Sequence, residues 1–429
     1  MLHYFSKSSI FTLGFLTAFM AVFLQVQLTL FADGDYRGLR IGAADICMPF
    51  IGLCVLWSLW RKKTKWPQWF SSRKIIWILS LVLVMSVALL NGYIVSDAFS
   101  SWAFINKYIG FFLLLSYFFL GNWIAANVED RQHIYAVFMR WFVGFFVAVM
   151  CATILALVLQ PFTPFSLWMQ HYPWDGFMVN RNAFMVIFVL VFSFVIWDYA
   201  AGSHSFPRWM LLCFWLSMPL FFVFNESRTG WIVAAILGCI FFLKNPLIRA
   251  KKVIPLLIVG VGLAYGSYYI VTDQVALAFN GDQLRHLLNV SDAPDEIYMG
   301  DQKRYIAIED GVDLYMRYNP LVGAGLGSYQ PFQIEKRGES IEIMDFTALW
   351  LLVETGGLGL LTFVSFFAYC AWLLYREGYC DKPSNYHRAM FIFLLLFAGM
   401  SVLHELMYTR VLWFSMGLAL AVQTNKKEC

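Results

Sequence analysis

The chain has 429 residues, of which 60% are apolar and only 14% are charged, and it contains 42 Phe, 21 Tyr and 17 Trp. No water-soluble domain hides that much apolar surface, so the composition excludes a soluble protein. The formal net charge of +4 is small for this length and argues against a nucleic-acid partner.

Apolar stretches separated by short charged breaks recur along the chain. About 20 consecutive apolar residues suffice to cross the hydrocarbon core as a helix. We therefore predict an all-α, polytopic membrane bundle that forms a single integral membrane domain over residues 1–429. Counts of ten or eleven spans remain alternatives to about twelve, because 230–243 is short and 346–375 is long enough to begin with a re-entrant or interfacial piece. The predicted spans are 9–31, 41–60, 75–95, 104–123, 141–160, 182–198, 209–224, 230–243, 253–272, 346–375, 389–406 and 410–423.

The distribution of Lys and Arg predicts the orientation, because these residues resist translocation. With the N-terminus inside, 19 of the 31 Lys and Arg lie in cytoplasmic breaks, and six of the other 12 belong to one long loop, which the rule discounts. We therefore predict that both termini are cytoplasmic.

The long loop over residues 272–345 is the only soluble-sized piece, and loops of this length are usually functional or disordered. Within it we expect an amphipathic helix over 302–318, followed by a turn-rich segment with Gly323, Gly325 and Gly327. These glycines form a GxGxG sequence without a strand before it, so we favour a tight turn over a dinucleotide site.

Candidate site residues from four separated segments fall on the same predicted side of the membrane. Charges near membrane depth tend to be paired or functional, so together they predict an outward-facing basic cleft. The residues are Arg181 and Asn182, Arg228, Arg304 and Arg317 of the long loop, and His404, Glu405 and Arg410.

Structural interpretations stand beside this one. Arg181 and Arg410 could extend to the lipid headgroups from helix ends. Glu226 and Arg228 could form an ion pair that caps a helix, and His404 with Glu405 could be a satisfied pair at a helix end. Three or more of these arginines together favour function, because the planar guanidinium binds phosphate oxygens in pairs and stays charged. The ligand expected for such a cleft at the lipid edge is a lipid pyrophosphate.

Several of these segments also resemble a known family in order and spacing. Ser227-Arg228-Thr229-Gly230-Trp231, then Arg304 ahead of Asn319-Pro320-Leu-Val-Gly323-Ala-Gly325, then Leu349-Trp-Leu-Leu-Val-Glu354-Thr-Gly356-Gly-Leu-Gly359 resemble the O-antigen polymerase and ligase family. The segment Gly176 to Asn182 is similar to that family's earlier asparagine-containing loop. The resemblance covers residues 176–417, whereas the N-terminal third is similar only in hydropathy.

The resemblance implies a GT-C-like, inverting, metal-independent glycosyltransferase of the bacterial inner membrane, with a periplasmic active site and no cofactor. Such enzymes polymerise undecaprenyl-pyrophosphate-linked repeat units of O-antigen or exopolysaccharide, or, as ligases, transfer the glycan to lipid A-core. Arg228 and Arg304 match the arginines expected to hold the pyrophosphate. The partners implied are therefore the lipid-linked glycan, a second lipid-linked glycan or lipid A-core as acceptor, and membrane lipids, and a chain-length regulator protein is compatible with this role.

One departure from the family concerns the general base. Ligases usually place a histidine nine residues before the glutamate matched by Glu354, and this chain has Asp345 there. Either Asp345 takes the proton from the acceptor hydroxyl, or His404 and Glu405 do. The missing histidine favours polymerase over ligase.

Two other classes of protein remain as alternatives. A transporter or flippase predicts ionisable residues deep in the spans, of which Asp45 is the most notable, and internal repeats, of which the sequence shows none. A structural scaffold has no use for arginines gathered on one side.

Overall fold

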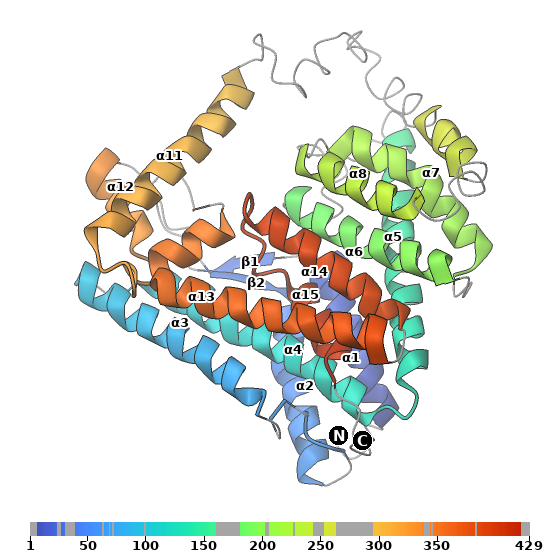
Figure 1. The fold of residues 1–429 in the computed structure, drawn as a ribbon, viewed down its shortest axis with the longest axis horizontal. Helices are drawn as coiled ribbons and strands as arrows, with labels where there is room; N and C mark the ends of the chain where they lie inside the picture. Colours follow the sequence, from blue (N-terminus) through green and yellow to red (C-terminus); the bar gives the residue numbers. More distant parts are fainter. Residues whose placement is uncertain are drawn as a thin grey trace. The chain divides into compact units, whose positions relative to one another are not determined.

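Helices dominate the computed structural model, drawn in Figure 1, and one short hairpin is the only sheet among the residues it describes. These residues are 7–23, 27–30, 39–61, 64–67, 69–70, 73–97, 100–159, 181–201, 206–225, 228–242, 253–262, 295–338, 344, 346–381 and 384–421.

A helix is found at each of the twelve predicted spans. At the N-terminal side these are α1 (Lys7–Phe23), α2 (Ala43–Trp60), α3 (Ile75–Ser96), the π-helical segment η2 (Ala103–Ile109) continued by α4 (Gly110–Asn127), and α5 (Arg131–Leu159). Then follow α6 (Arg181–Ala201), α7 (Arg208–Asn225), α8 (Arg228–Phe242) and a helix over Val253–Gly262. The last three are α13 (Thr347–Tyr375), which η4 (Arg376–Asp381) continues, α14 (Asn385–Ser401) and α15 (Arg410–Ala419).

Five of the helices described are long and apolar enough to cross a membrane. They are Ala43–Trp60, Ile75–Ser96, Ala103–Asn127, Arg131–Ala152 and Thr347–Cys380, and four shorter apolar helices accompany them. The prediction of an all-α, multi-pass membrane bundle is therefore confirmed, whereas the count of twelve spans and the GT-C-like arrangement stay predictions.

The first predicted span differs from the structure at its end. Its helix stops at Phe23, and Gln27–Leu30 (β1) pairs antiparallel with Leu39–Gly42 (β2), with Gln27 opposite Gly42. The polar–apolar alternation from Gln25 to Leu30 has the period of a strand rather than of a helix. Pairing of β1 with β2 satisfies the backbone groups that the two strands turn toward each other.

The chain divides into two compact units, residues 1–134 with 300–429, and residues 135–299. In the second unit, α5, α6 and α7 pack through stacked and tilted rings of Phe146, Phe184, Phe188 and Phe221. Aromatic pairs of this kind stabilise a fold by more than the burial of their apolar area alone. The single domain over 1–429 stays a prediction.

In the first unit α4 and α15 make the most extensive helix contact. A Cβ atom on Gly121 would overlap the carbonyl oxygen of Phe414, and one on Gly417 would overlap that of Phe118. Small residues let membrane helices approach closely. Close approach matters in lipid because dispersion contacts, rather than the hydrophobic effect, hold the helices together.

Side chains from several elements satisfy the last carbonyl groups of α15, which have no partner within the helix. Asn122 donates to the oxygen of Gly417 at 3.3 Å, the Nε2 atom of His387 lies 2.9 Å from that of Ala419, and Trp69 donates to that of Leu420 at 3.3 Å. Arg131 donates to the oxygen of Ala421 at 2.9 Å. These bonds fix α15, and with it the position of Arg410 at its other end.

The part of the predicted loop that the structure describes contains α11 (Asp295–Arg317) and α12 (Tyr329–Arg337), joined by turns over residues 318–328. The predicted amphipathic helix over 302–318 is confirmed, and it begins seven residues earlier than expected. The first part of the loop, 272–294, lies outside the described residues.

Candidate functional site

A break in α13 is the feature on which this site is built. Gly356 has φ 71° and ψ −178°, which interrupts the helix between Thr355 and Gly357. The break leaves the carbonyl groups of Val353 and Glu354, and the amide groups of Gly357 and Leu358, without their usual i to i+4 bonds. Unpaired backbone groups are costly in a membrane protein, so another segment must satisfy them.

Residues 319–328, which we call the glycine loop, satisfy all four groups. Ala324 and Gly325 donate to the oxygens of Val353 and Glu354 at 2.8 and 3.1 Å. In return, Gly357 and Leu358 donate to the loop carbonyls of Pro320 and Leu321, at 2.8 and 3.1 Å. The loop thus replaces two helical hydrogen bonds by four of its own and is fixed to α13.

The same loop is fixed to α3. Leu326 donates its N–H to the oxygen of Ala88 at 2.8 Å, and the Asn91 side chain donates to the oxygen of Gly323 at 2.7 Å. A Cβ atom on Gly325 would overlap the backbone of Gly92. The glycine loop therefore joins two membrane helices by backbone contacts.

Three glycines of the loop have a backbone conformation that other residues rarely adopt. The φ angles of Gly323, Gly325 and Gly327 are 74°, 93° and 80°. A Cβ atom on Gly323 would also lie 2.5 Å from the nitrogen of Gly356. The tight-turn interpretation of GxGxG is confirmed, and the glycines serve close backbone approach.

A buried ion pair joins η2 to α13 at Glu354, whose carbonyl group is bonded to the glycine loop. The Nζ atom of Lys107 lies 2.9 Å from Oε2 of Glu354, and the two side chains are 5% and 1% exposed. Trp350 donates its indole N–H to the same oxygen at 2.7 Å, and the rings of Trp102 and Trp350 flank the ammonium group at 4.8 and 4.6 Å. Both charges are thus compensated by specific partners, which a buried pair requires.

A second ion pair lies where α2 and α15 begin. Arg410 donates from Nε to Oδ1 of Asp45 at 2.6 Å and from Nη2 to Oδ2 of the same carboxylate. Asp45 also accepts the N–H of Gly42 at 3.0 Å, in the first turn of α2. The substrate-binding role predicted for Arg410 must therefore compete with a carboxylate that already occupies its guanidinium.

Tyr408 contacts the first of the two ion pairs. It donates its hydroxyl to the carbonyl oxygen of Lys107 at 3.1 Å, its ring lies 5.9 Å from that of Trp350, and Arg410 follows two residues later. The two pairs are therefore linked through one short segment, residues 402–410.

The same segment is bonded to the start of α13. Thr347 donates its N–H and its hydroxyl to the oxygen of His404, at 3.3 and 2.8 Å, and accepts the N–H of Leu406 at 2.9 Å. Asp345 lies outside the described residues, but Thr347 follows it by two positions. The segment that carries His404 and Glu405 is thus bonded to the first residue of α13.

Helix α11 packs on this start as well. A Cβ atom on Gly311 would lie 3.2 Å from Leu349 and 3.3 Å from Met344. Arg304 is half-buried two helical turns before Gly311, and Arg317 lies exposed at the helix end, 4.6 Å over the ring of Phe332. Arg304 is therefore carried by a helix that contacts the chain on either side of residue 345.

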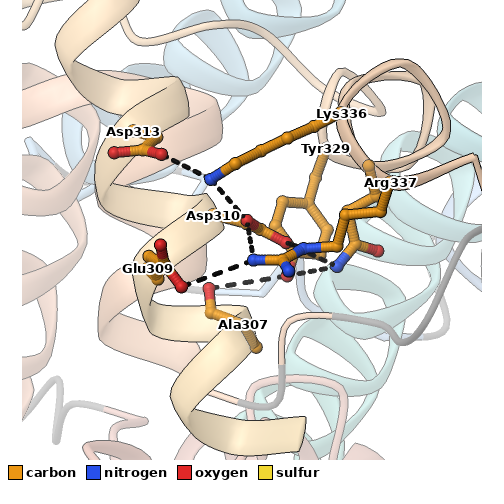
Figure 2. A network of polar contacts seen from close by, with 8 residues as sticks. Ala307, Glu309, Asp310, Asp313, Tyr329, Lys336 and Arg337 are labelled. Atoms are coloured by element: carbon orange, nitrogen blue, oxygen red, sulfur yellow. Dashed lines mark hydrogen bonds and ion pairs between the residues drawn. The ribbon is translucent and has the colours of Figure 1, made fainter.

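A cluster around Asp310 holds α11 against α12 (Figure 2). Arg337 donates from Nε and Nη2 to the two carboxylate oxygens, both at 2.8 Å, and Lys336 donates to Oδ1 at 2.9 Å and to Asp313 at 2.5 Å. We call Asp310, Lys336 and Arg337 the clasp. Burial would raise the pKa of Asp310, but hydrogen bonds from Arg337, Lys336 and Gln333 outweigh it and lower that pKa.

The other predicted site residues lie in the second unit. Arg181 and Asn182 open α6, and Arg228 opens α8, but their side chains lie outside the described part of the structure. The clamp formed by Arg228 with Arg304 joins residues of two units and stays a prediction, as do the roles of Asn182 and Asp345.

Sequence reasoning missed the pairing of Lys107 with Glu354. A signal was present, because Lys107 is a lone cation at the edge of an apolar stretch, where ionisable residues are rare unless paired or functional. Glu354, inside the predicted span 346–375, carried the same signal, but the sequence did not show that the two residues pair, since they are 247 positions apart.

Among the described residues no group of three or more His, Cys, Asp or Glu could hold a metal ion. The sequence also contains Asp33-Gly34-Asp35, whose paired carboxylates are of the type that divalent cations prefer. These two acids lie outside the described residues.

The buried pair yields a first prediction. Lys107→Met or Glu354→Gln alone should destabilise the protein by about 3 kcal/mol, because each leaves a buried polar group without its partner. The double variant should recover a large part of this loss. Thermal unfolding of the four proteins in nanodiscs measures the coupling, and strictly additive losses would show that the pair does not act as a unit.

The clasp yields a second prediction, which concerns pH and the stability of α12. Since folding lowers the pKa of Asp310, its contribution is fully present above the ordinary carboxyl pKa and is lost as the pH falls through the lowered value. Asp310→Asn should cost about 2 kcal/mol locally and speed amide exchange in α12 about 30-fold. Glu309→Gln is the control, because Glu309 is half exposed and its bond to Arg337 is 3.4 Å long. Equal exchange rates in the two variants would contradict this account. So would a change between pH 5 and 8 in the protection of the α12 amides relative to intrinsic exchange.

Comparison with known proteins finds a family model that matches part of this site. Residues 209–364 match the family model described as O-Antigen ligase, and this segment includes Arg228, Arg304, the glycine loop and Glu354. No curated protein matches the chain. The match confirms the resemblance to the O-antigen polymerase and ligase family over residues 209–364 of this multi-pass membrane protein.

Proposed function

We propose that the chain is an inner-membrane glycosyltransferase that takes a glycan from undecaprenyl pyrophosphate on the periplasmic side. The family match carries the proposal, because it covers both proposed clamp arginines and the glycine loop with its partner Glu354. We favour a polymerase, which joins the glycan to a second lipid-linked glycan. Asp345, in place of the ligase histidine, supports that choice.

A ligase is the second candidate, because the matching family model carries that description. In that case lipid A-core supplies the acceptor hydroxyl, and the donor and the chemistry at the anomeric carbon are unchanged. The two candidates therefore differ in the acceptor alone.

The proposed reaction is a single displacement. The acceptor hydroxyl oxygen attacks the anomeric carbon, the bond from that carbon to the pyrophosphate oxygen breaks, and its electron pair leaves with undecaprenyl pyrophosphate. Asp345, or His404 with Glu405, takes the hydroxyl proton. Attack opposite the leaving group inverts the anomeric configuration, and no metal takes part.

Guanidinium groups stabilise the leaving group in this proposal. Charge grows on the pyrophosphate as the bond breaks, so fixed cations nearby lower the barrier. Arg304 is suited to this because α11 packs on α13 through Gly311 and on α12 through the clasp, which limits its movement. Arg228 completes the clamp, with Arg181, Asn182, Arg317 and Arg410 as further contacts to the substrate.

Substitution of the clamp tests the proposal. Arg304→Ala and Arg228→Ala should abolish chain extension while the protein still inserts, and Arg304→Lys should retain only part, because a lysine lacks the planar fork. Lys303→Ala is the matched control on the same helix. Glycan ladders on gels measure the outcome, and EDTA should leave the activity of the purified protein unchanged.

Normal ladders from both arginine variants would contradict the clamp. In a deletion strain, short glycans on an intact core indicate a polymerase, and loss of all glycan from the core indicates a ligase. Accumulation of intermediate on the cytoplasmic side would instead indicate a flippase. Loss of activity in EDTA would contradict the metal-independent reaction and direct attention to Asp33 and Asp35.

A further inference from the structure

Helix α11 carries a row of large apolar side chains that the described protein leaves uncovered. Tyr305, Ile308, Val312 and Met316 are 69%, 42%, 42% and 75% exposed. Their spacing of three and four residues places them on one side of the helix, in an arc about 100° wide with Tyr315 at its edge. We call these four residues the apolar arc.

The apolar arc is not the side of α11 that packs on the protein. Ala307, Gly311 and Leu314 form the buried side, and Gly311 faces α13. Glu309, Asp310 and Asp313 form the acidic side, which binds α12 (Figure 2). The helix therefore has two apolar sides, of which the described residues cover one.

The C-terminal end of the apolar arc lies near a second exposed apolar surface, on α13 and the glycine loop. Leu358 and Leu361 of α13 are 54% and 63% exposed in a segment long and apolar enough to span the membrane. The glycine loop continues this surface, because the N–H of Leu358 donates to the oxygen of Leu321, itself 57% exposed. Apolar side chains exposed on a membrane-spanning segment contact acyl chains.

The end of α11 is tied to the same place. Tyr315 donates its hydroxyl to the oxygen of Pro320 at 3.2 Å, directly before Leu321. Met316, at one end of the apolar arc, is thereby held close to the exposed leucines of the glycine loop and α13. Arg304 precedes the arc and Arg317 follows it, as cations do at the edges of helices that lie in a membrane interface.

We infer that α11 lies on the bilayer surface, with the apolar arc in the boundary between lipid headgroups and acyl chains. An amphipathic helix with exposed aromatic and aliphatic residues and flanking cations binds lipid in this way. The bilayer, rather than a protein, is the occupant that continuity with the lipid-facing surface of α13 favours.

The contact has a consequence for Arg304, which rests on the proposed function. A helix seated in the headgroup layer holds its side chains at the depth at which the pyrophosphate of a membrane-bound donor lies. The clasp fixes α11 from the protein side, and the apolar arc fixes it from the lipid side. Arg304 lies on the same helix, directly before the first residue of the apolar arc.

Photo-crosslinking in native membranes tests the contact without relying on activity. A benzophenone amino acid is placed at Met316 or Tyr305, and at Glu335 as the control, an exposed position on α12. After irradiation, adducts are identified by mass. We expect phospholipid adducts at Met316 and Tyr305 to exceed those at Glu335 by about tenfold.

Three outcomes would overturn the inference. They are adducts with peptides from residues 135–299, adducts with another protein, and lipid adducts no more frequent than at Glu335. Because the crosslink reports contact alone, a lipid adduct together with a normal glycan ladder in Arg304→Ala would refute the clamp and leave the lipid contact standing.

Discussion

The exchange of hydrogen bonds between the broken helix α13 and the glycine loop is the interaction on which the rest of this structure depends. Gly356 ends one piece of α13 and starts the next, and residues 320–325 take over the backbone groups that the break sets free. Because these four hydrogen bonds pair specific residues, the loop can dock on α13 in only one alignment. The two helices that flank the loop, α11 and α12, are therefore placed relative to α3 and α13 by backbone hydrogen bonds.

Buried charges extend this constraint into the bundle. Glu354 lies two residues before Gly356 and contributes its carbonyl to the loop and its carboxylate to Lys107. The same residue thus connects the break to the π-helical segment η2, which departs from regular α geometry as functional segments of helices frequently do. Arg410 with Asp45 forms a second such connection, and Tyr408 joins the two. These buried polar side chains are held in place because each satisfies the charge or the hydrogen-bonding groups of another.

The sequence predicted the helices well and the contacts between them poorly, for physical reasons. Membrane helices follow from local hydropathy, so α3 is found over Ile75–Ser96 where 75–95 was expected. The turn at the glycine loop follows from glycine itself. The docking of that loop on α3 depends on residues more than 200 positions apart, as the bond from Asn91 to Gly323 shows. Likewise, the sequence around Arg410 is the same whether its guanidinium binds a phosphate or the carboxylate of Asp45. Only the fold distinguishes these two partners.

Transfer of a glycan from a lipid pyrophosphate is the central claim, and product analysis with the purified full-length protein in nanodiscs tests it most directly. A defined undecaprenyl-pyrophosphate oligosaccharide is supplied alone and together with lipid A-core, and products are read by mass. The account predicts lipid-linked products at multiples of the repeat-unit mass from the donor alone, with free undecaprenyl pyrophosphate released. Transfer to lipid A-core only would identify a ligase within the same chemistry. Recovery of the donor unchanged in both mixtures, with the protein correctly folded, would contradict the account.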